Sequence, residues 1–279
     1  MEFIKTNIKY ISITALIVII LFASITIPFS NKSQIEDNTQ QDIVIIPYTD
    51  YDFSKLKKEN NHYEYEDDNY QSMFGIDVSA HQDIINWKKA KEDGVEFVYI
   101  RLGYRGASEG VLHTDVEFEN NYKRAVENDI KVGIYWYSQP IDTYEVKQEV
   151  RYVLDVLDGR PLDLPIVYDL EETEFYDGTI SRLHDTTKQE RTAMAETFCS
   201  EMTNLGYDCM IYTNLYWSDN YYDWSKLSNY PIWFAQYGVD YPNYDRPFVM
   251  WQYTDDGVID GIDNPVDLDI LFIRKNDQN

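Results

Sequence analysis

The feature that most restricts the fold is a regular alternation of strand-like and helix-like segments between residues 74 and 215. Short runs of β-branched and aromatic residues predict strands, and the segments between them carry apolar residues at helical spacing. Strand–helix units joined by short links form parallel strands with right-handed crossovers, so the fold must be a doubly wound sheet or a barrel. The five predicted strands are residues 74–79, 97–102, 131–138, 165–171 and 210–213.

The pattern changes after Leu215. Three further strand-like runs, residues 231–237, 248–254 and 266–272, follow one another too closely for full helices to lie between them. We therefore predict an α/β fold, an irregular β/α barrel of about five βα units closed by three further β-strands. This barrel domain is predicted to span residues 73–279.

The first 72 residues differ in character. Lys5 and Lys9 precede an uncharged apolar run, residues 10–29, that is long enough to cross a bilayer. Residues 1–30 are therefore predicted to be a transmembrane anchor or a signal sequence, and the lack of a good cleavage site favours the anchor. The charges place the remaining chain outside the cytoplasm, anchored to the cell membrane or secreted after cleavage. Residues 31–72 are acidic and aperiodic, which predicts a polar linker.

Composition excludes some partners and leaves others open. The net charge of −25 argues against nucleic acid, whose phosphates need a basic surface. The four histidines show no spacing typical of metal ligands, so no metal and no cofactor is predicted, while a carboxylate-only metal site stays open. Cys199 and Cys209 are compatible with either a disulfide or two buried thiols. We expect a monomer.

The fourth predicted strand ends in acids. Asp169 and Glu171 are two residues apart, so their side chains share a face of the strand. Their Cα atoms would lie about 6.6 Å apart, close enough for each carboxylate to raise the pKa of the other. Such a pair can keep one carboxyl protonated at neutral pH while the other stays ionised. The alternative is a solvated strand end whose acids cap a helix or pair with arginine.

Acids also occur on the first and last predicted strands. Asp77 lies on the first, and Asp267 and Asp269 lie on the last. Barrel closure would make these two strands neighbours, and the carboxyl-terminal rim of such barrels carries the active site. We therefore expect four or five carboxylates around one mouth.

Aromatic residues fall on the same strands. Flat apolar rings with polar edges suit sugars, so an acidic mouth lined by aromatics predicts a carbohydrate substrate. Side chains alternate along a strand, so only about half of these rings can face the mouth. The aromatic residues in question are Tyr135, Tyr137, Tyr212, Trp233, Tyr237, Trp251 and Tyr253.

Several of these motifs, in this order, resemble the signatures of the glycoside hydrolase family 25 lysozymes. The resemblance runs from about Phe74 to Phe272. It implies the barrel already predicted and an N-acetylmuramidase that cuts the β-1,4 bond between N-acetylmuramic acid and N-acetylglucosamine. Asp269 stands where an asparagine is common in the family. The motifs are Gly75–Ser79, Gly133–Tyr135, Tyr168–Glu171, Trp251–Tyr253 and Val266–Leu268.

The resemblance assigns the active-site acids to Asp77, Asp169 and Glu171, with Asp267 in the same cleft. We expect Glu171 to be the general acid and Asp169 to stay ionised, either stabilising positive charge or orienting the substrate's acetamido group. Asp77 is expected to position substrate and tune pKa values. The predicted substrate-binding residues are Asp267, Tyr135, Tyr137, Tyr212, Trp233, Gln252 and Tyr253, and the predicted partner is the peptidoglycan glycan strand.

Three other functions remain open. A chitinase-like N-acetylglucosaminidase also uses acids two apart on a fourth strand, but Val167 occupies the place of a further Asp. A catalytically inactive wall-glycan-binding protein and a metal-dependent hydrolase are the others. The strand spacing does not separate retaining from inverting chemistry, because the two side chains can converge or splay.

Overall fold

The computed structural model describes residues 45, 47, 51–60, 62–173 and 175–275. Chain contacts divide the protein into Met1–Gln41 and Asp42–Asn279, and the described residues all belong to the second unit. The predicted membrane segment, residues 1–30, and the first part of the predicted linker lie outside them. Within the described ranges, every helix is too short or too polar to cross a membrane.

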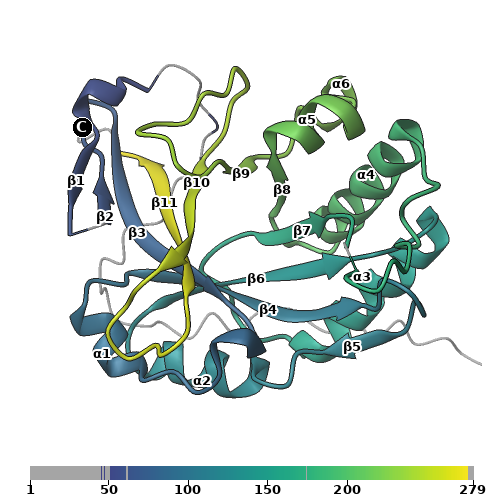
Figure 1. Cartoon of the computed structure of the whole chain (residues 1–279), viewed down its shortest axis with the longest axis horizontal. Helices are drawn as coiled ribbons and strands as arrows, with labels where there is room; N and C mark the ends of the chain where they lie inside the picture. Colours follow the sequence, from purple (N-terminus) through teal and green to yellow (C-terminus); the bar gives the residue numbers. More distant parts are fainter. Residues whose placement is uncertain (1–44, 46, 48–50, 61, 174, 276–279) are drawn as a thin grey trace, which may run out of the picture. The chain divides into compact units, whose positions relative to one another are not determined.

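Eight strands form a closed β-barrel (Figure 1). The ring closes because β3 pairs with β4 on one side and with β11 on the other. All neighbouring strands are parallel except for β11, which runs antiparallel to both β10 and β3. The mixed α/β barrel predicted from the sequence is therefore confirmed. Its strands are β3 (Tyr70–Val78), β4 (Phe97–Arg105), β6 (Lys131–Ser138), β7 (Ile166–Leu170), β8 (Cys209–Asn214), β9 (Ile232–Ala235), β10 (Met250–Gly257) and β11 (Val266–Arg274).

Helices follow the first five barrel strands, and loops join the last three, as the sequence predicts. Their bounds are α1 (Trp87–Glu92), α2 (Phe118–Glu127), α3 (Thr143–Leu157), α4 (Lys188–Asn204), α5 (Leu215–Tyr221) and α6 (Trp224–Leu227). The first helix begins at Trp87 because the Asn86 side chain caps it, accepting a hydrogen bond from the Lys89 amide at 3.2 Å. A short strand, β5 (Leu112–Thr114), extends the sheet beside β4.

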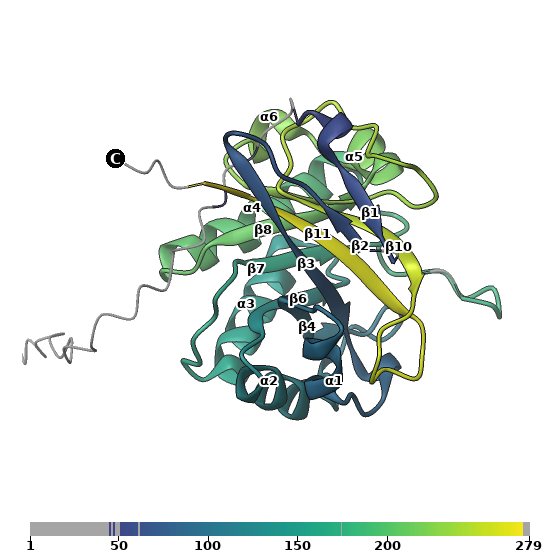
Figure 2. The same ribbon diagram turned by 90° about the vertical axis from the view of Figure 1, so that its left-hand side faces the viewer.

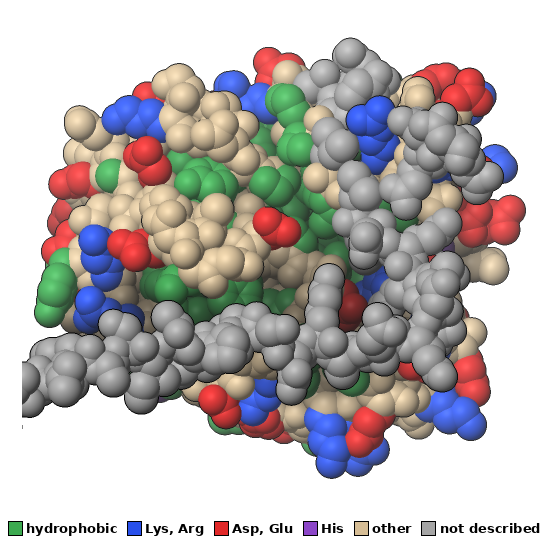
Figure 3. All heavy atoms as spheres, turned by 180° about the vertical axis from the view of Figure 1, so that it is seen from behind, with side chains coloured by type: hydrophobic (Ala, Val, Ile, Leu, Met, Phe, Trp, Pro, Cys, Tyr) green, Lys and Arg blue, Asp and Glu red, His purple; other side chains and the backbone are tan. Residues whose placement is uncertain are grey.

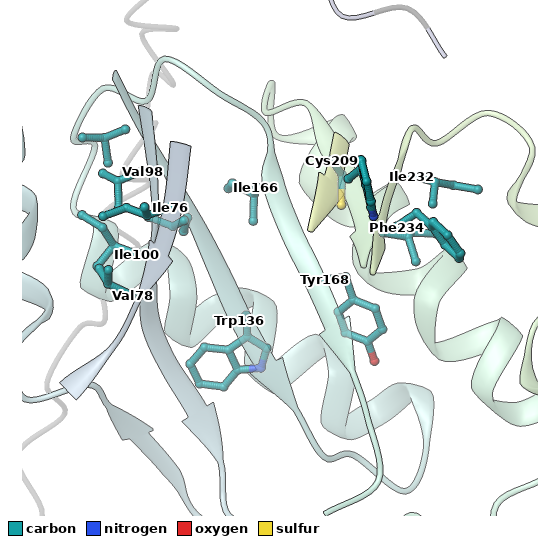
Figure 4. Packing of buried hydrophobic residues seen from close by; sticks show 14 of the residues in the cluster. Ile76, Val78, Val98, Ile100, Trp136, Ile166, Tyr168, Cys209, Ile232 and Phe234 are labelled. Atoms are coloured by element: carbon teal, nitrogen blue, oxygen red, sulfur yellow. The ribbon is translucent and has the colours of Figure 1, made fainter. Parts of the chain in front are cut away.

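Alternation along the strands produces two cores. Outward residues such as Ile76 and Ile134 pack under the helices, and Figure 4 shows part of this outer core. Inward residues fill the barrel itself, where the rings of Phe97 and Tyr99 are fully buried. Room for these rings comes from glycine: a Cβ at Gly75 or Gly133 would lie 2.4 Å from the ring of Phe97 or Tyr99, respectively. The glycines of the two sequence motifs therefore make space for the barrel core.

The folded unit begins earlier than the predicted boundary at residue 73. A hairpin of β1 (Lys57–Glu59) and β2 (His62–Glu64) precedes β3, and Figure 2 shows it lying along β3 and β11. Tyr51, Tyr63 and Tyr65 are buried in the outer core. Tyr51 stacks on Phe272 with ring centroids 4.3 Å apart, and its hydroxyl donates to a backbone carbonyl of the barrel.

The described residues 51–60 and 62–72 are therefore part of the barrel domain rather than a linker. The sequence pattern missed them because their apolar residues are mostly tyrosines, which bury their rings while their hydroxyls find polar partners. The tyrosines follow neither a strand period nor a helix period over this stretch. The alternative left open for the cysteines is also settled, since Cys199 and Cys209 are both buried and unoxidised.

We predict that Tyr65→Ala lowers the free energy of unfolding by about 3 kcal/mol, the usual cost of removing a buried aromatic ring. Tyr65 is only 2% exposed, and its hydroxyl donates to Asp67 at 2.5 Å. Tyr176→Ala is the matched control, because Tyr176 is fully exposed and its loss should change stability by less than about 0.5 kcal/mol. Urea denaturation measures both. Equal stability of the two variants would mean that the segment containing Tyr65 does not stabilise the barrel and acts as a linker.

Candidate active site

A cavity of about 220 Å³ opens at the carboxyl-terminal ends of the parallel strands. Nine of the ten residues predicted for the site line it, and Arg101 and Tyr237 join them. Together the lining residues come from all eight barrel strands and from the segments after β7 and β9. They are Asp77, Arg101, Tyr135, Tyr137, Asp169, Glu171, Tyr212, Trp233, Tyr237, Gln252 and Asp267.

Strand register brings the acids together. Asp77 is the next-to-last residue of β3 and is paired directly with Asp267, the second residue of the antiparallel β11. Asp169 is paired with Tyr137 of the neighbouring β6, and Glu171 follows immediately after β7. Side chains two apart share a face, so Asp169 and Glu171 both point into the mouth while Leu170 is buried in the outer core. The prediction that acids from the first, fourth and last strands lie around one mouth is confirmed.

Gln252 connects one side of the mouth. Its amide nitrogen donates to Asp77 Oδ2 at 2.6 Å, and its carbonyl oxygen accepts from the hydroxyls of Tyr212, at 2.8 Å, and Tyr237, at 2.6 Å. Two donors on the oxygen fix which end of the amide faces Asp77. The network therefore orients the Asp77 carboxyl without placing a charge next to it.

Aromatic rings form the floor and walls. Trp233 is almost fully buried, stacks on Tyr99 at 5.1 Å and meets the edge of Tyr212 at 5.0 Å, so it forms part of the floor. Tyr237 is 42% exposed at the rim, where its ring is accessible. Tyr137 is held by a 2.8 Å hydrogen bond between its hydroxyl and Thr173. Rigid rings around a polar centre are suited to the faces of sugar residues.

Tyr253 is the one predicted site residue that the structure places elsewhere. It packs against Tyr63 and Trp251, with ring centroids at 4.8 Å and 5.5 Å, on the outside of the barrel. The reason is the strand period: Gln252 points inward, so its two neighbours on β10 must point outward. The sequence shows that Gln252 and Tyr253 lie on opposite faces of β10. Which of the two points inward becomes clear only from the hydrogen bond between Gln252 and Asp77.

Burial raises the pKa of both members of the acid pair. The pKa of Glu171 is raised to about 7 by desolvation. The pKa of Asp169 is also raised well above its usual range, first by desolvation and then by the charges of Glu171 and Asp77. The expectation that Asp169 is the ionised member of the pair stays a prediction. The two carboxyls titrate as a coupled pair, and the form with one proton between them has both an acid and a carboxylate.

Arg101 is the cation that the sequence analysis missed. It lies on the inner face of β4 and contacts Asp115 through two nitrogens, at 2.7 Å and 2.8 Å from Oδ2. Its charge lowers the pKa of Asp169, against the larger effect of desolvation. A signal was present, since Arg101 lies two residues after the inward Tyr99 at the rim end of its strand. Tyr237 was noticed as an aromatic residue but was not assigned to the site.

The candidate active site is not the larger of the two cavities considered. A cavity of about 1010 Å³ lies at the amino-terminal ends of the strands, lined by residues such as Ile45, Pro165, Cys209 and Pro231. Its described lining includes two acids, Asp163 and Asp208, and Asp163 accepts a hydrogen bond from the Val132 amide at 2.9 Å. Across the described part of the chain, no group of three or more His, Cys, Asp or Glu side chains is arranged to hold a metal ion.

The surface charge is mixed as well as acidic. On the part of the reverse face formed by described residues, Lys and Arg side chains are scattered among Asp and Glu (Figure 3). No continuous basic patch is visible on that face of the described chain.

A closed barrel with a buried, coupled acid pair at its carboxyl-terminal mouth defines a site for acid-assisted hydrolysis of a glycoside. The sequence profile described as Glycosyl hydrolases family 25 matches residues 76–262, which include every acid of the mouth except Asp267. The chain belongs to this family.

Two relatives are similar over most of the barrel. The autolytic lysozyme of Clostridium acetobutylicum is 31% identical over 198 residues, covering 71% of this chain and 55% of the relative. Lysozyme M1 of Streptomyces globisporus is 30% identical over 201 residues, covering 69% and 65%. The chain thus spans little more than half the length of the first of these relatives.

Solved structures share the fold. The modular autolysin LytC from Streptococcus pneumoniae, solved in complex with a synthetic peptidoglycan ligand, superposes with a TM-score of 0.65 at 20% identity over 77% of this chain and 52% of LytC. The spore cortex lytic enzyme SleM from Clostridium perfringens gives 0.61 at 24% identity over 72% and 67%. At this level of identity, both comparisons bear on the fold alone.

The acid pair generates a mutational prediction. Glu171→Gln should lower kcat by about 10²–10⁴-fold, because glutamine keeps the shape but cannot deliver a proton. A substrate with a good leaving group needs little protonation, so it should partly rescue this variant but not Asp169→Asn. Glu172→Gln is the matched control: Glu172 pairs with His184 at 2.8 Å, is absent from the cavity lining, and its loss should leave kcat within a few-fold of wild type.

The pH dependence has a defined sign. Glu171 must be protonated to act, so activity should fall as pH rises through about 7, the pKa to which burial raises it. Asp169→Asn removes a negative charge that favours the proton on Glu171, so the alkaline limb of its residual activity should move to lower pH. Rate measurements across pH test this. An alkaline limb that stays in place, or moves upward, would contradict the coupling of the two acids.

Proposed function

We propose that this protein is a peptidoglycan hydrolase, an N-acetylmuramidase that cleaves the β-1,4 bond between N-acetylmuramic acid and N-acetylglucosamine in the bacterial cell wall. The observation that carries the proposal is the coupled pair Asp169 and Glu171 facing an aromatic-lined cavity at the barrel mouth. Membership of the family supports it, as do the names of the relatives, an autolytic lysozyme and Lysozyme M1.

In the proposed reaction, Glu171 donates a proton to the departing glycosidic oxygen. Its raised pKa keeps it protonated up to about neutral pH, and Glu171 is partly exposed, so its carboxyl can reach the substrate. Asp169, more deeply buried, is the group placed to support positive charge at the anomeric carbon. The reactive form has one proton shared by the pair, which Arg101 favours by attracting the charge to Asp169.

The remaining groups position the glycan. Asp77 is held by Gln252, and Asp267 lies beside it with a pKa raised to about 9, chiefly by burial. An acid of that kind is neutral at pH 7 and can donate a hydrogen bond to a sugar hydroxyl or amide oxygen. Asp77 or Asp169 can accept from the N–H of a 2-acetamido group, which orients that group toward the anomeric carbon.

Mass spectrometry of the products tests the bond specificity. We expect purified peptidoglycan treated with the protein to yield fragments with N-acetylmuramic acid at the reducing end. Fragments ending in N-acetylglucosamine would instead support the chitinase-like N-acetylglucosaminidase. Binding of wall glycan without release of any fragment, equal in wild type and Glu171→Gln, would support the inactive wall-binding protein. Undiminished cleavage in EDTA is expected, because the proposed reaction uses carboxyl groups alone.

We further propose that residues 1–30 anchor the enzyme in the cell membrane, with the barrel on the extracytoplasmic side. The support is the uncharged run over residues 10–29, preceded by Lys5 and Lys9. The full-length protein should therefore fractionate with membranes, and protease added to cells whose wall has been removed should digest the barrel. Recovery of only a shortened, soluble form from the medium would identify the segment as a cleaved signal sequence.

A further inference from the structure

Asp269 lies directly beneath the mouth and takes no part in the proposed reaction. Its side chain is fully buried on the inner face of β11. The indole nitrogen of Trp233 donates to its Oδ1 at 2.9 Å, and its Oδ2 has no hydrogen-bond donor. The carboxyl of Asp77 is within hydrogen-bonding contact of it. Two carboxyl groups therefore face each other in the interior of the barrel, and neither offers the other a hydrogen unless one is protonated.

The surroundings contain no compensating cation among the described residues. The groups that face Asp269 are Asp77 from β3, Tyr99 from β4, Trp233 from β9, Gln252 from β10 and Asp267 on its own strand. All of these are acids or neutral groups. The nearest arginine of the mouth, Arg101, is already engaged by Asp115.

The two acids differ in how well they are paired. Asp77 receives an N–H from Gln252 at 2.6 Å and is also in hydrogen-bonding contact with Asp267, whereas Asp269 receives only one N–H, from Trp233 at 2.9 Å. A single neutral donor is too little to stabilise a buried Asp269 carboxylate at contact distance from Asp77. A single hydrogen between them would give the unsatisfied Oδ2 of Asp269 its partner and leave the pair with one negative charge.

We propose that Asp77 and Asp269 share one proton, so that Asp269 is a positioning residue that holds the Asp77 carboxyl in place from below. Burial and the neighbouring carboxylates raise the pKa of both groups, which agrees with this arrangement. The proposal rests on the proposed function only in treating Asp77 as part of the substrate site. The shared proton itself belongs to the folded protein and exists without substrate.

The number of protons released when the protein unfolds tests for a shared proton directly. Both acids are ionised in the unfolded chain above about pH 5, so a proton held only in the folded state is released on unfolding. That proton stabilises the fold at low pH, and its contribution is lost as pH rises toward the raised pKa of the pair. Its contribution to the slope is a tenfold fall in the folding equilibrium constant for each pH unit.

We expect Asp269→Asn to reduce the number of protons released on unfolding by one, because its amide supplies the hydrogen to Asp77 without titrating. The double variant Asp77→Asn with Asp269→Asn should also reduce it by one, and not by two. Urea denaturation at a series of pH values between 5.5 and about 8 gives the count from the slope. Asp67→Asn is the control: against the effect of burial, hydrogen bonds from Tyr65 and from the Tyr70 and Asn69 amides lower the pKa of Asp67, so its loss should change stability but not the slope over this range.

Two results would overturn the proposal. An unchanged slope in Asp269→Asn would mean that the folded pair holds no proton, and a reduction by two in the double variant would mean that both acids are neutral. Should Asp269→Asn not fold, infrared spectroscopy of the wild type decides the matter. The carboxylic C=O band at neutral pH must weaken in Asp77→Asn by the intensity of one group. None of these readouts uses substrate, so failure of the muramidase assay would leave them intact, and the reverse also holds.

Discussion

The site depends on one structural constraint, the closure of the barrel by a single antiparallel strand. β11 runs against both of its neighbours, so its beginning, rather than its end, lies at the catalytic mouth. This reversal places Asp267 opposite Asp77 and puts Asp269 one inward position deeper. A parallel closing strand would have carried the same two acids to the opposite end of the barrel. The four acids of the mouth therefore meet because of strand direction as much as because of strand order.

Little positive charge surrounds these acids. The described mouth contains one arginine, and that arginine is tied to Asp115. Neutral donors such as Gln252 and Trp233 do most of the hydrogen bonding instead. Carboxyl groups in such surroundings retain protons that they would lose in water. The same surroundings thus raise the pKa of the proposed general acid and constrain its neighbours.

Much of this arrangement follows from sequence periodicity. The spacing of Asp169 and Glu171 predicts a shared face, and the strand count predicts that Asp77 and Asp267 become neighbours. Other features depend on contacts between segments far apart in the chain. The inward direction of β10, which excludes Tyr253 from the mouth, is set by the bond from Gln252 to Asp77 across 175 residues. The effect of Arg101 and the raised pKa of Asp169 likewise arise only in the folded barrel.

The tyrosines before β3 show a different limit. Sequence patterns identify buried segments by periodic apolar residues, and a stretch that buries isolated tyrosine rings among acids and asparagines lacks that signal. The packing of Tyr51 on Phe272 is visible only once the last strand is in place. An accurate domain boundary therefore required the structure, although the fold class did not.

The glycines beneath the mouth have a consequence for the kind of polymer this barrel can accept. Because Gly75 and Gly133 let the rings of Phe97 and Tyr99 fill the interior, the barrel is solid below its acids and offers no channel. Under the proposed function, a glycan strand therefore lies across the open end of the barrel rather than passing through it.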